Sequence, residues 1–310
     1  MKSLSAARAR ALRTAFDGLL ADADTGRFVQ RDPVVFVRRY AEPKDQEIAG
    51  AVASALAFGK VDLFFPVLTK LFAEADARGG PHAYATSFSK KDAKRLAPLY
   101  YRWNRGNDFA LWFATLGRAV RDHGSIAALF GERTHPLRPF GAPPPPEAGE
   151  EMRDALEHAV TVLEVLAQEE ARRLGLQVTR SFKTFLPRPS SGSACKRWNM
   201  FLRWMVRADD GIDLGVWSLS SSSLVLPLDT HTHRISQYVG LTTRKQANWR
   251  TAVEITESLR LLDPRDPVKY DFALAHLGIS GGCRRRYRAE ICSTCALLPV
   301  CRFAQLGTPP

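Results

Sequence analysis

Apolar residues recur at intervals of three and four positions along much of this chain. The spacing is clearest in three stretches, 45–74, 107–130 and 150–175. It places the apolar side chains on one face of an α-helix, and Gly175 is a typical helix stop. The alternation of apolar and polar residues that predicts a strand is scarce. We therefore expect an all-α fold whose helices are joined by short loops.

Two segments interrupt the helical pattern. The stretch 134–150 is too rich in proline for a regular element and predicts an exposed linker or insertion between two helices. The serine-rich stretch 218–223 is typical of a flexible connector. The helices on either side of 134–150 are thus expected to be separate elements.

The charge balance is strongly basic. The 310 residues contain 44 Lys and Arg against 32 Asp and Glu, a net charge of +12, and the hydrophobic share of 45% is ordinary for a globular protein. This excess favours a polyanionic partner, because phosphate contacts release counterions, although a basic solvated surface has the same composition. The sequence has no apolar run as long as a membrane span and no signal-peptide core at its start. We expect a cytoplasmic protein with no membrane partner.

Four of the five cysteines, Cys283, Cys292, Cys295 and Cys301, lie near the end of the chain, with eight, two and five residues between them. Clustered thiols in a reduced compartment are usually metal ligands. Structural zinc sites mostly pair two Cys-x-x-Cys knuckles, and this chain has one. A single knuckle with unequal flanking gaps favours a [4Fe-4S] cluster, with zinc as the alternative.

The stretch 186–207 predicts two helices joined by a tight turn at Gly192. We expect the second helix to begin near Ala194 and to carry Lys196 one turn in. The first N–H groups of such a helix point outward, where a phosphate can accept them. An ordinary capped turn is the alternative, because most Ser/Gly turns before helices are caps.

A further stretch, 224–241, leads from an apolar run into Asp229 and Thr230, either of which could cap the next helix. His231 and His233 have the spacing of a metal pair, but the sequence has no acidic or Cys residue at helical spacing to complete a site. We expect core or capping histidines there.

The order of these motifs resembles the helix-hairpin-helix DNA glycosylase superfamily, and within it endonuclease III. The stretch 192–199 looks like the later part of that family's hairpin, including its lysine and asparagine. Leu228, Asp229, Thr230, His231 and Arg234 match its Val-Asp-Thr-His motif and following arginine. The inner Cys-x2-Cys-x5-Cys of its iron-sulfur loop matches Cys292, Cys295 and Cys301.

Three features differ from endonuclease III. The first cysteine gap is longer, and Lys196 and Asp229 are 33 positions apart, a wider separation that looks more like the archaeal 8-oxoguanine glycosylases, which lack the cluster. In addition, Leu56 falls where endonuclease III has the glutamine that fills the gap left by an extruded base. The chain is therefore expected to represent a branch with traits of both groups.

The resemblance implies a DNA repair enzyme that acts on double-stranded DNA containing a damaged, oxidised base. Asp229 would stabilise positive charge on the sugar, and Lys196 would be the nucleophile of a bifunctional glycosylase with β-elimination lyase activity. It also implies a helical barrel domain, 45–225, with the hairpin at 186–207. A second helical domain, 1–44 plus 226–310, would carry the metal loop 283–301. We expect a monomer associated with the nucleoid.

Several residues are candidates for contact with DNA. The hairpin contributes Gly192, Ser193, Ala194 and Arg197, and the loop between the first two cysteines contributes Arg284, Arg285, Arg286 and Arg288. We expect these arginines to bind the phosphate backbone rather than to read bases. The alternative from another class is a non-catalytic DNA- or RNA-binding protein that uses the same hairpin and arginine loop. An aromatic and polar group that could stack on a base or pack as core is formed by Tyr101, Trp103, Asn104 and Arg105.

Overall fold

The computed structural model describes residues 4–23, 25–131, 148–284 and 287–306. Within these residues the protein is mostly helical. One short antiparallel ribbon has two residues in each strand, and in it Tyr100 pairs with Arg105 and Tyr101 with Asn104. The all-α expectation is confirmed. No described helix is long and apolar enough to cross a bilayer.

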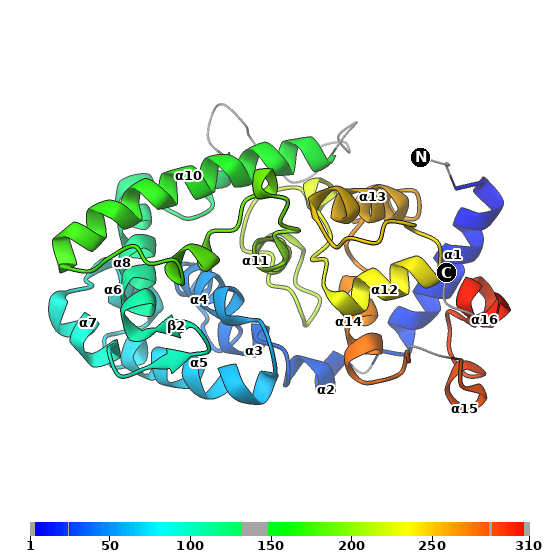
Figure 1. Cartoon of the computed structure of the whole chain (residues 1–310), viewed down its shortest axis with the longest axis horizontal. Coiled ribbons are helices and arrows are strands. Elements are labelled where there is room, and N and C mark those ends of the chain that lie inside the picture. The colour runs from blue at the N-terminus through cyan, green and yellow to red at the C-terminus, as the bar shows by residue number, and fades with distance from the viewer. Residues whose placement is uncertain (1–3, 24, 132–147, 285–286, 307–310) are drawn as a thin grey trace.

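The first half of the chain forms short and medium helices and one short ribbon (Figure 1). Its elements are α1 (Ala6–Ala21), α2 (Thr25–Val29), α3 (Val34–Val37), α4 (Pro43–Leu56), α5 (Val61–Asp76), α6 (Pro81–Thr86), α7 (Lys90–Leu96), β1 (Tyr100–Tyr101), β2 (Asn104–Arg105), α8 (Gly106–His123) and α9 (Ala128–Gly131).

The second half begins with the longest helix and ends in a tail of short turns. Its elements are α10 (Ala148–Leu174), the 3-10 helices η1 (Phe182–Phe185) and η2 (Pro189–Ser191), α11 (Lys196–Val206), η3 (Ser221–Ser223), α12 (Thr230–Tyr238), α13 (Trp249–Arg260), α14 (Asp271–Ile279), α15 (Ala289–Cys292), η4 (Leu298–Val300) and α16 (Arg302–Leu306).

Two of the long predicted helices are each divided in two. The stretch 45–74 forms α4 and α5, separated by a loop in which Gly59 has φ +85°. The stretch 107–130 forms α8 and α9, separated at Gly124, where φ is +84°. Glycine adopts these left-handed angles without a Cβ clash, and this ends the preceding helix. The third stretch forms the single helix α10, which ends at Leu174 before Gly175, as predicted. Most of the proline-rich segment 134–150 lies outside the described residues, and its last three residues already belong to α10.

Glycines allow two close helix contacts on which the packing depends. A Cβ on Gly117 of α8 would lie 1.9 Å from the Ala85 carbonyl oxygen of α6, and one on Gly50 of α4 would lie 2.9 Å from the Phe201 ring of α11. Helix α11 therefore packs directly on α4. The side chains of α11 that were expected to face inward are buried, namely Phe201, Leu202, Met205 and Val206.

Figure 1 shows α4 to α8 with α10 toward one end of the molecule, α1 and α12 to α16 toward the other, and α11 between them. Helix α1 contacts η4 and α14, so the start of the chain packs with its end. The Arg8 guanidinium donates to the Val239 and Val300 carbonyl oxygens at 3.0 and 2.6 Å, which ties α1 to α12 and the tail. Helix α3, by contrast, packs on α4.

The segment 208–223 separates the hairpin stretch 186–207 from the Asp229 stretch 224–241. It is ordered by hydrogen bonds to α11 and by buried polar groups. Leu214 and Trp217 donate their backbone N–H groups to the Trp204 and Met205 carbonyls, each at 2.8 Å. The Arg260 side chain donates to the Ser222 carbonyl at 2.7 Å. The expectation of a flexible connector at 218–223 is wrong, because η3 is held in the interior by these hydrogen bonds, with Ser222 and Ser223 buried.

Candidate functional site

The turn before α11 is built by two residues with left-handed backbones. Gly192 has φ +79° and Cys195 has φ +48°. A non-glycine residue in this region is uncommon and costs roughly 1 kcal/mol. The Cys195 N–H donates to Ser193 Oγ at 3.1 Å, which helps to hold the turn.

This turn differs from the predicted hairpin in two respects. Its first arm consists of the short 3-10 helices η1 and η2 rather than an α-helix, because prolines at 187 and 189 limit regular hydrogen bonding. Helix α11 begins at Lys196, so this lysine opens the helix instead of lying one turn inside it. Among the described residues, no side chain caps this end of α11. The first N–H groups of the helix are thus without a side-chain acceptor.

The Lys196 amine is enclosed, although the residue as a whole is partly exposed. Its Nζ donates to Met200 Sδ at 3.2 Å, one turn along α11. Burial lowers the pKa of this amine, and the carboxylates of Asp229, Asp32 and Asp271 act in the opposite direction. A thioether is a weak acceptor, so the pairing with Met200 does little to stabilise the ammonium form. The site therefore favours a neutral amine more than bulk water does.

Asp229 approaches the same place from α12. Its Oδ1 accepts the N–H groups of His231 and Thr232 at 2.8 and 2.7 Å, so the residue is the predicted N-cap of this helix. Of the charges that raise the pKa of Lys196, the charge of this carboxylate has the largest effect. The structure thus places the amine and the carboxyl group, which are 33 positions apart in the sequence, within range of each other's charge.

A second carboxyl group, that of Asp271, lies beside this pair and was not singled out from the sequence. Asp271 opens α14, is 3% exposed and accepts a hydrogen bond from Arg203. Burial raises its pKa to about 6; Asp229 adds to the rise, while the charges of Arg203 and Lys196 oppose it. In sequence, an Asp at the start of an apolar helix is indistinguishable from an ordinary first-turn acid, so no signal would have revealed this contact.

Arg203 is held in turn by the inserted segment. Its Nε donates to Asp213 Oδ1 at 3.1 Å, and Asp213 also accepts from Arg207. All three side chains are buried, and buried charges are tolerated when each one is paired. The insertion between the two motifs therefore orders the Arg203–Asp271 pair next to Lys196.

The guanidinium of Arg197 faces the protein interior. It donates to the carbonyl oxygens of Ala55 on α4 and Thr184 on η1. Arg197 therefore fastens the turn to α4, and the expectation that it contacts DNA phosphates is not supported. Gly192, Ser193 and Ala194 remain at least partly exposed at the turn. Leu56 is 1% exposed, so its side chain packs in the protein interior.

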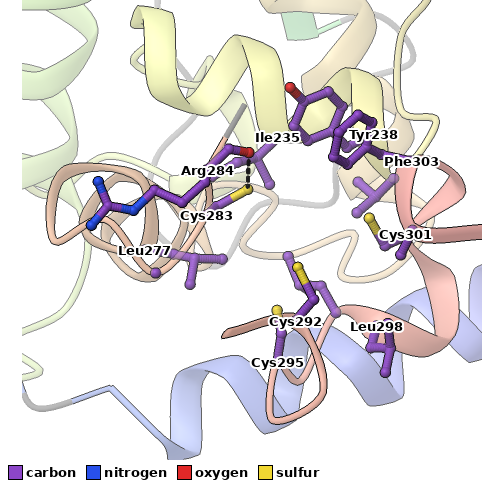
Figure 2. Close-up of a pocket in the computed structure, with 14 residues that line it drawn as sticks. Ile235, Tyr238, Leu277, Cys283, Arg284, Cys292, Cys295, Leu298, Cys301 and Phe303 are labelled. Atoms are coloured by element: carbon purple, nitrogen blue, oxygen red, sulfur yellow. Dashed lines mark hydrogen bonds between the residues drawn. The ribbon is translucent and has the colours of Figure 1, made fainter. Parts of the chain in front are cut away.

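The four tail cysteines line one pocket (Figure 2). Its walls are apolar side chains from α12, α14 and the tail, among them Ile235, Tyr238, Leu277, Leu298 and Phe303. Burial raises the pKa of the Cys283 thiol to about 11; the nearby Arg234 lowers it, and the other three cysteines raise it. In the described part of the chain, no three His, Cys, Asp or Glu side chains are grouped tightly enough to hold a single metal ion.

Arg234 links the cysteine pocket to the Asp229 helix. Its Nη2 lies 3.3 Å from the Cys283 carbonyl oxygen and 3.5 Å from His231 Nδ1. Arg284 lines the pocket and is exposed, and the Arg288 N–H points to Cys292 Sγ at 3.5 Å.

The predicted arginine finger is described only in part. Arg285 and Arg286, which complete it, lie outside the described residues.

These elements define a mostly helical protein in which an enclosed amine and a carboxylate lie at the starts of two helices, and a pocket between α12, α14 and the tail is lined by four thiols. The chain belongs to the family described as a protein of unknown function, DUF2400, whose family model matches residues 32–280. The match includes Lys196 and Asp229 and ends before Cys283. No curated protein and no solved structure matches the chain.

Proposed function

We propose that the protein is a DNA glycosylase that removes a damaged base, with lyase activity through Lys196. The observation that carries this proposal is that the enclosed Lys196 amine lies within electrostatic range of the Asp229 carboxylate. A lysine acts as a nucleophile when it is deprotonated, and enclosure in the protein favours that form. The motif resemblance supplies the substrate class, DNA with a damaged, oxidised base that is extruded from the duplex.

Each group has a defined task in the proposed reaction. The Lys196 nitrogen forms a bond to the sugar C1′ as the bond from C1′ to the base nitrogen breaks. The base leaves with that electron pair and takes up a proton, while the lysine nitrogen releases one. Asp229 stabilises the positive charge that develops on the sugar. Ring opening then gives a Schiff base, from which β-elimination of the 3′ phosphate can proceed.

The turn before α11 is the proposed anchor for the DNA backbone. Gly192, Ser193 and Ala194 leave room for a phosphate to approach the free N–H groups of the helix, where the helix dipole also favours an anion. Arg284 and Arg288 would add contacts from the cysteine loop. A net charge of +12 agrees with a polyanionic partner.

We propose that the four tail cysteines hold a [4Fe-4S] cluster, with zinc as the alternative. All four thiols line one apolar pocket, and the sequence contains one Cys-x-x-Cys knuckle instead of the two that structural zinc sites mostly pair. Cys283, Cys292, Cys295 and Cys301 would be the ligands, and a bound cluster would supply a rigid anchor for the arginine loop. Brown colour in anaerobically purified protein would support the cluster; its absence together with bound zinc would favour the alternative.

Borohydride trapping tests the proposed activity. Incubation with duplexes that each carry one modified base, in the presence of borohydride, should yield a covalent protein–DNA adduct. The adduct should vanish in Lys196→Gln and persist in Lys183→Gln, which removes an exposed lysine from η1 beside the turn. A folded wild-type protein that binds these duplexes tightly and is never trapped would instead support the non-catalytic DNA- or RNA-binding role.

A further inference from the structure

An exposed aromatic surface lies beside the start of α11, at the tip of the β1–β2 ribbon. Trp103 is 49% exposed, which is unusual for so large an apolar side chain. Its ring stacks on Phe58, with centroids 5.0 Å apart and planes inclined by 16°. The Arg102 guanidinium lies over both rings, 5.1 Å from the Trp103 centroid and 5.8 Å from that of Phe58. We call Phe58, Arg102 and Trp103 the aromatic platform.

The backbone under the platform is tightly constrained. Arg102 has φ +54°, a left-handed conformation that side chains other than glycine rarely adopt. Gly59 has φ +85°, and a Cβ there would lie 2.7 Å from the Tyr101 hydroxyl. That hydroxyl donates to the Phe58 carbonyl oxygen, so the ribbon and the α4–α5 loop are locked together. Strained, over-determined conformations of this kind cluster at binding sites.

Buried polar groups anchor the other end of the ribbon. Asn104 is fully buried, and its Nδ2 donates to the Ser181 carbonyl oxygen at 2.9 Å. Asp108, in the first turn of α8, accepts the Arg105 N–H at 2.8 Å and the Ser181 hydroxyl at 2.8 Å. The indole is thus presented on a rigid support, and its exposure is not the result of a loose loop.

The surroundings of the platform are cationic and adjoin the proposed catalytic helix. Arg102, Arg105 and Lys60 are exposed around it. The Arg197 guanidinium, which belongs to the residue after Lys196, lies 5.1 Å from the Phe58 ring centroid. A flat ring surface bordered by positive charge complements a base and its phosphates, because every base has a π-face and stacking needs no particular sequence.

We propose that the aromatic platform stacks on an unpaired nucleobase of DNA. The inference goes beyond the proposed function, because holding an unpaired base requires no bond to be made or broken. A paired base keeps its faces stacked on its neighbours, so the platform selects DNA in which a base has lost its partner.

Fluorescence anisotropy with two labelled duplexes tests this. One duplex contains a tetrahydrofuran abasic analogue, which leaves the opposite base unpaired, and the other is fully paired. The wild-type protein should prefer the first duplex, and Trp103→Leu should weaken binding to it by about tenfold without changing binding to the paired duplex. Trp103→Phe, which restores a ring, should recover most of the affinity and exclude a folding defect.

Tyr100→Leu is the matched control. Tyr100 is an exposed ring of the same ribbon that does not belong to the aromatic platform, so its loss should not affect the preference for the unpaired base. Equal losses on both duplexes in Trp103→Leu, or no loss on either, would overturn the proposal. The binding preference is measured independently of adduct formation. A protein that prefers the unpaired base but is never trapped by borohydride would support the platform and contradict the glycosylase. A protein that is trapped but shows no preference would support the glycosylase and contradict the platform.

Discussion

The contact between Lys196 and Met200 means that a substitution at Met200 should change the pKa of the lysine. Replacing Met200 by Glu keeps a side chain of similar length on the same turn of α11, but it puts a carboxylate where Sδ now accepts from Nζ at 3.2 Å. A hydrogen bond to a charged group contributes about 1.5–3 kcal/mol, more than a thioether can provide. Since one pKa unit corresponds to about 1.4 kcal/mol, the substitution should raise the pKa of Lys196 by about one to two units.

The sign of the effect on reactivity follows directly. Below its pKa, an amine loses its neutral fraction tenfold for each unit by which that pKa rises. The rate of borohydride trapping at a fixed pH below the lysine pKa should therefore fall about 10- to 100-fold in Met200→Glu. The acidic limb of the pH–rate profile should move upward by the same one to two units.

Single-turnover trapping rates measured across a pH series provide the assay. Met200→Leu removes the sulfur without adding charge, and its acidic limb should stay at or below that of the wild type. Met200 is 5% exposed, so thermal unfolding of both variants shows whether this buried position tolerates each substitution. If Met200→Glu is folded and its acidic limb coincides with that of the wild type, Lys196 is not the reacting amine, and the role assigned to its surroundings is refuted.

Other predictions concern the buried charges, the cysteines and the DNA contacts. Because the Asp271 carboxylate raises the pKa of Lys196, Asp271→Asn should shift the acidic limb of trapping to lower pH; an upward shift would contradict the assigned direction. Asp213→Asn leaves buried arginine charge without its partner and should lower the free energy of unfolding by about 3–5 kcal/mol in denaturant titrations. Cys295→Ser should reduce the absorbance at about 400 nm of anaerobically purified protein, whereas retention of the full signal would remove Cys295 from the ligand set. Arg284→Ala should reduce the slope of log binding constant against log salt by about one, and an unchanged slope would exclude a phosphate contact there.

The features that the sequence predicted well depend on near neighbours along the chain. The length and end of α10 followed from apolar spacing and Gly175, and the cap at Asp229 followed from its place before a helix, because both interactions span a few residues. The division at Gly59 was missed, since a lone glycine in a helical pattern is compatible with either a continuous or a broken helix.

The polar partners of the site depend on contacts between distant elements. Arg197 looked like a phosphate ligand in the hairpin motif, but its guanidinium reaches the carbonyl oxygens of Ala55 and Thr184 once α11 packs on α4. Likewise, Trp103 and Asn104 are adjacent in the sequence, yet one is exposed and the other fully buried. Residue type alone does not distinguish these outcomes, because burial is set by what packs against each side chain.

The helical class, the cap at Asp229 and the grouping of the cysteines were predictable from the chain alone, since these arise from local spacing and backbone preference. The enclosure of Lys196 and the contact of its amine with Met200 arise from the packing of distant elements. The same is true of the influence of Asp229 and Asp271 on that amine, and of the ordering of this neighbourhood by Arg203 and Asp213. Desolvation and Coulomb interactions depend on distance in space, and apolar spacing along the chain does not specify the packing of one helix against another.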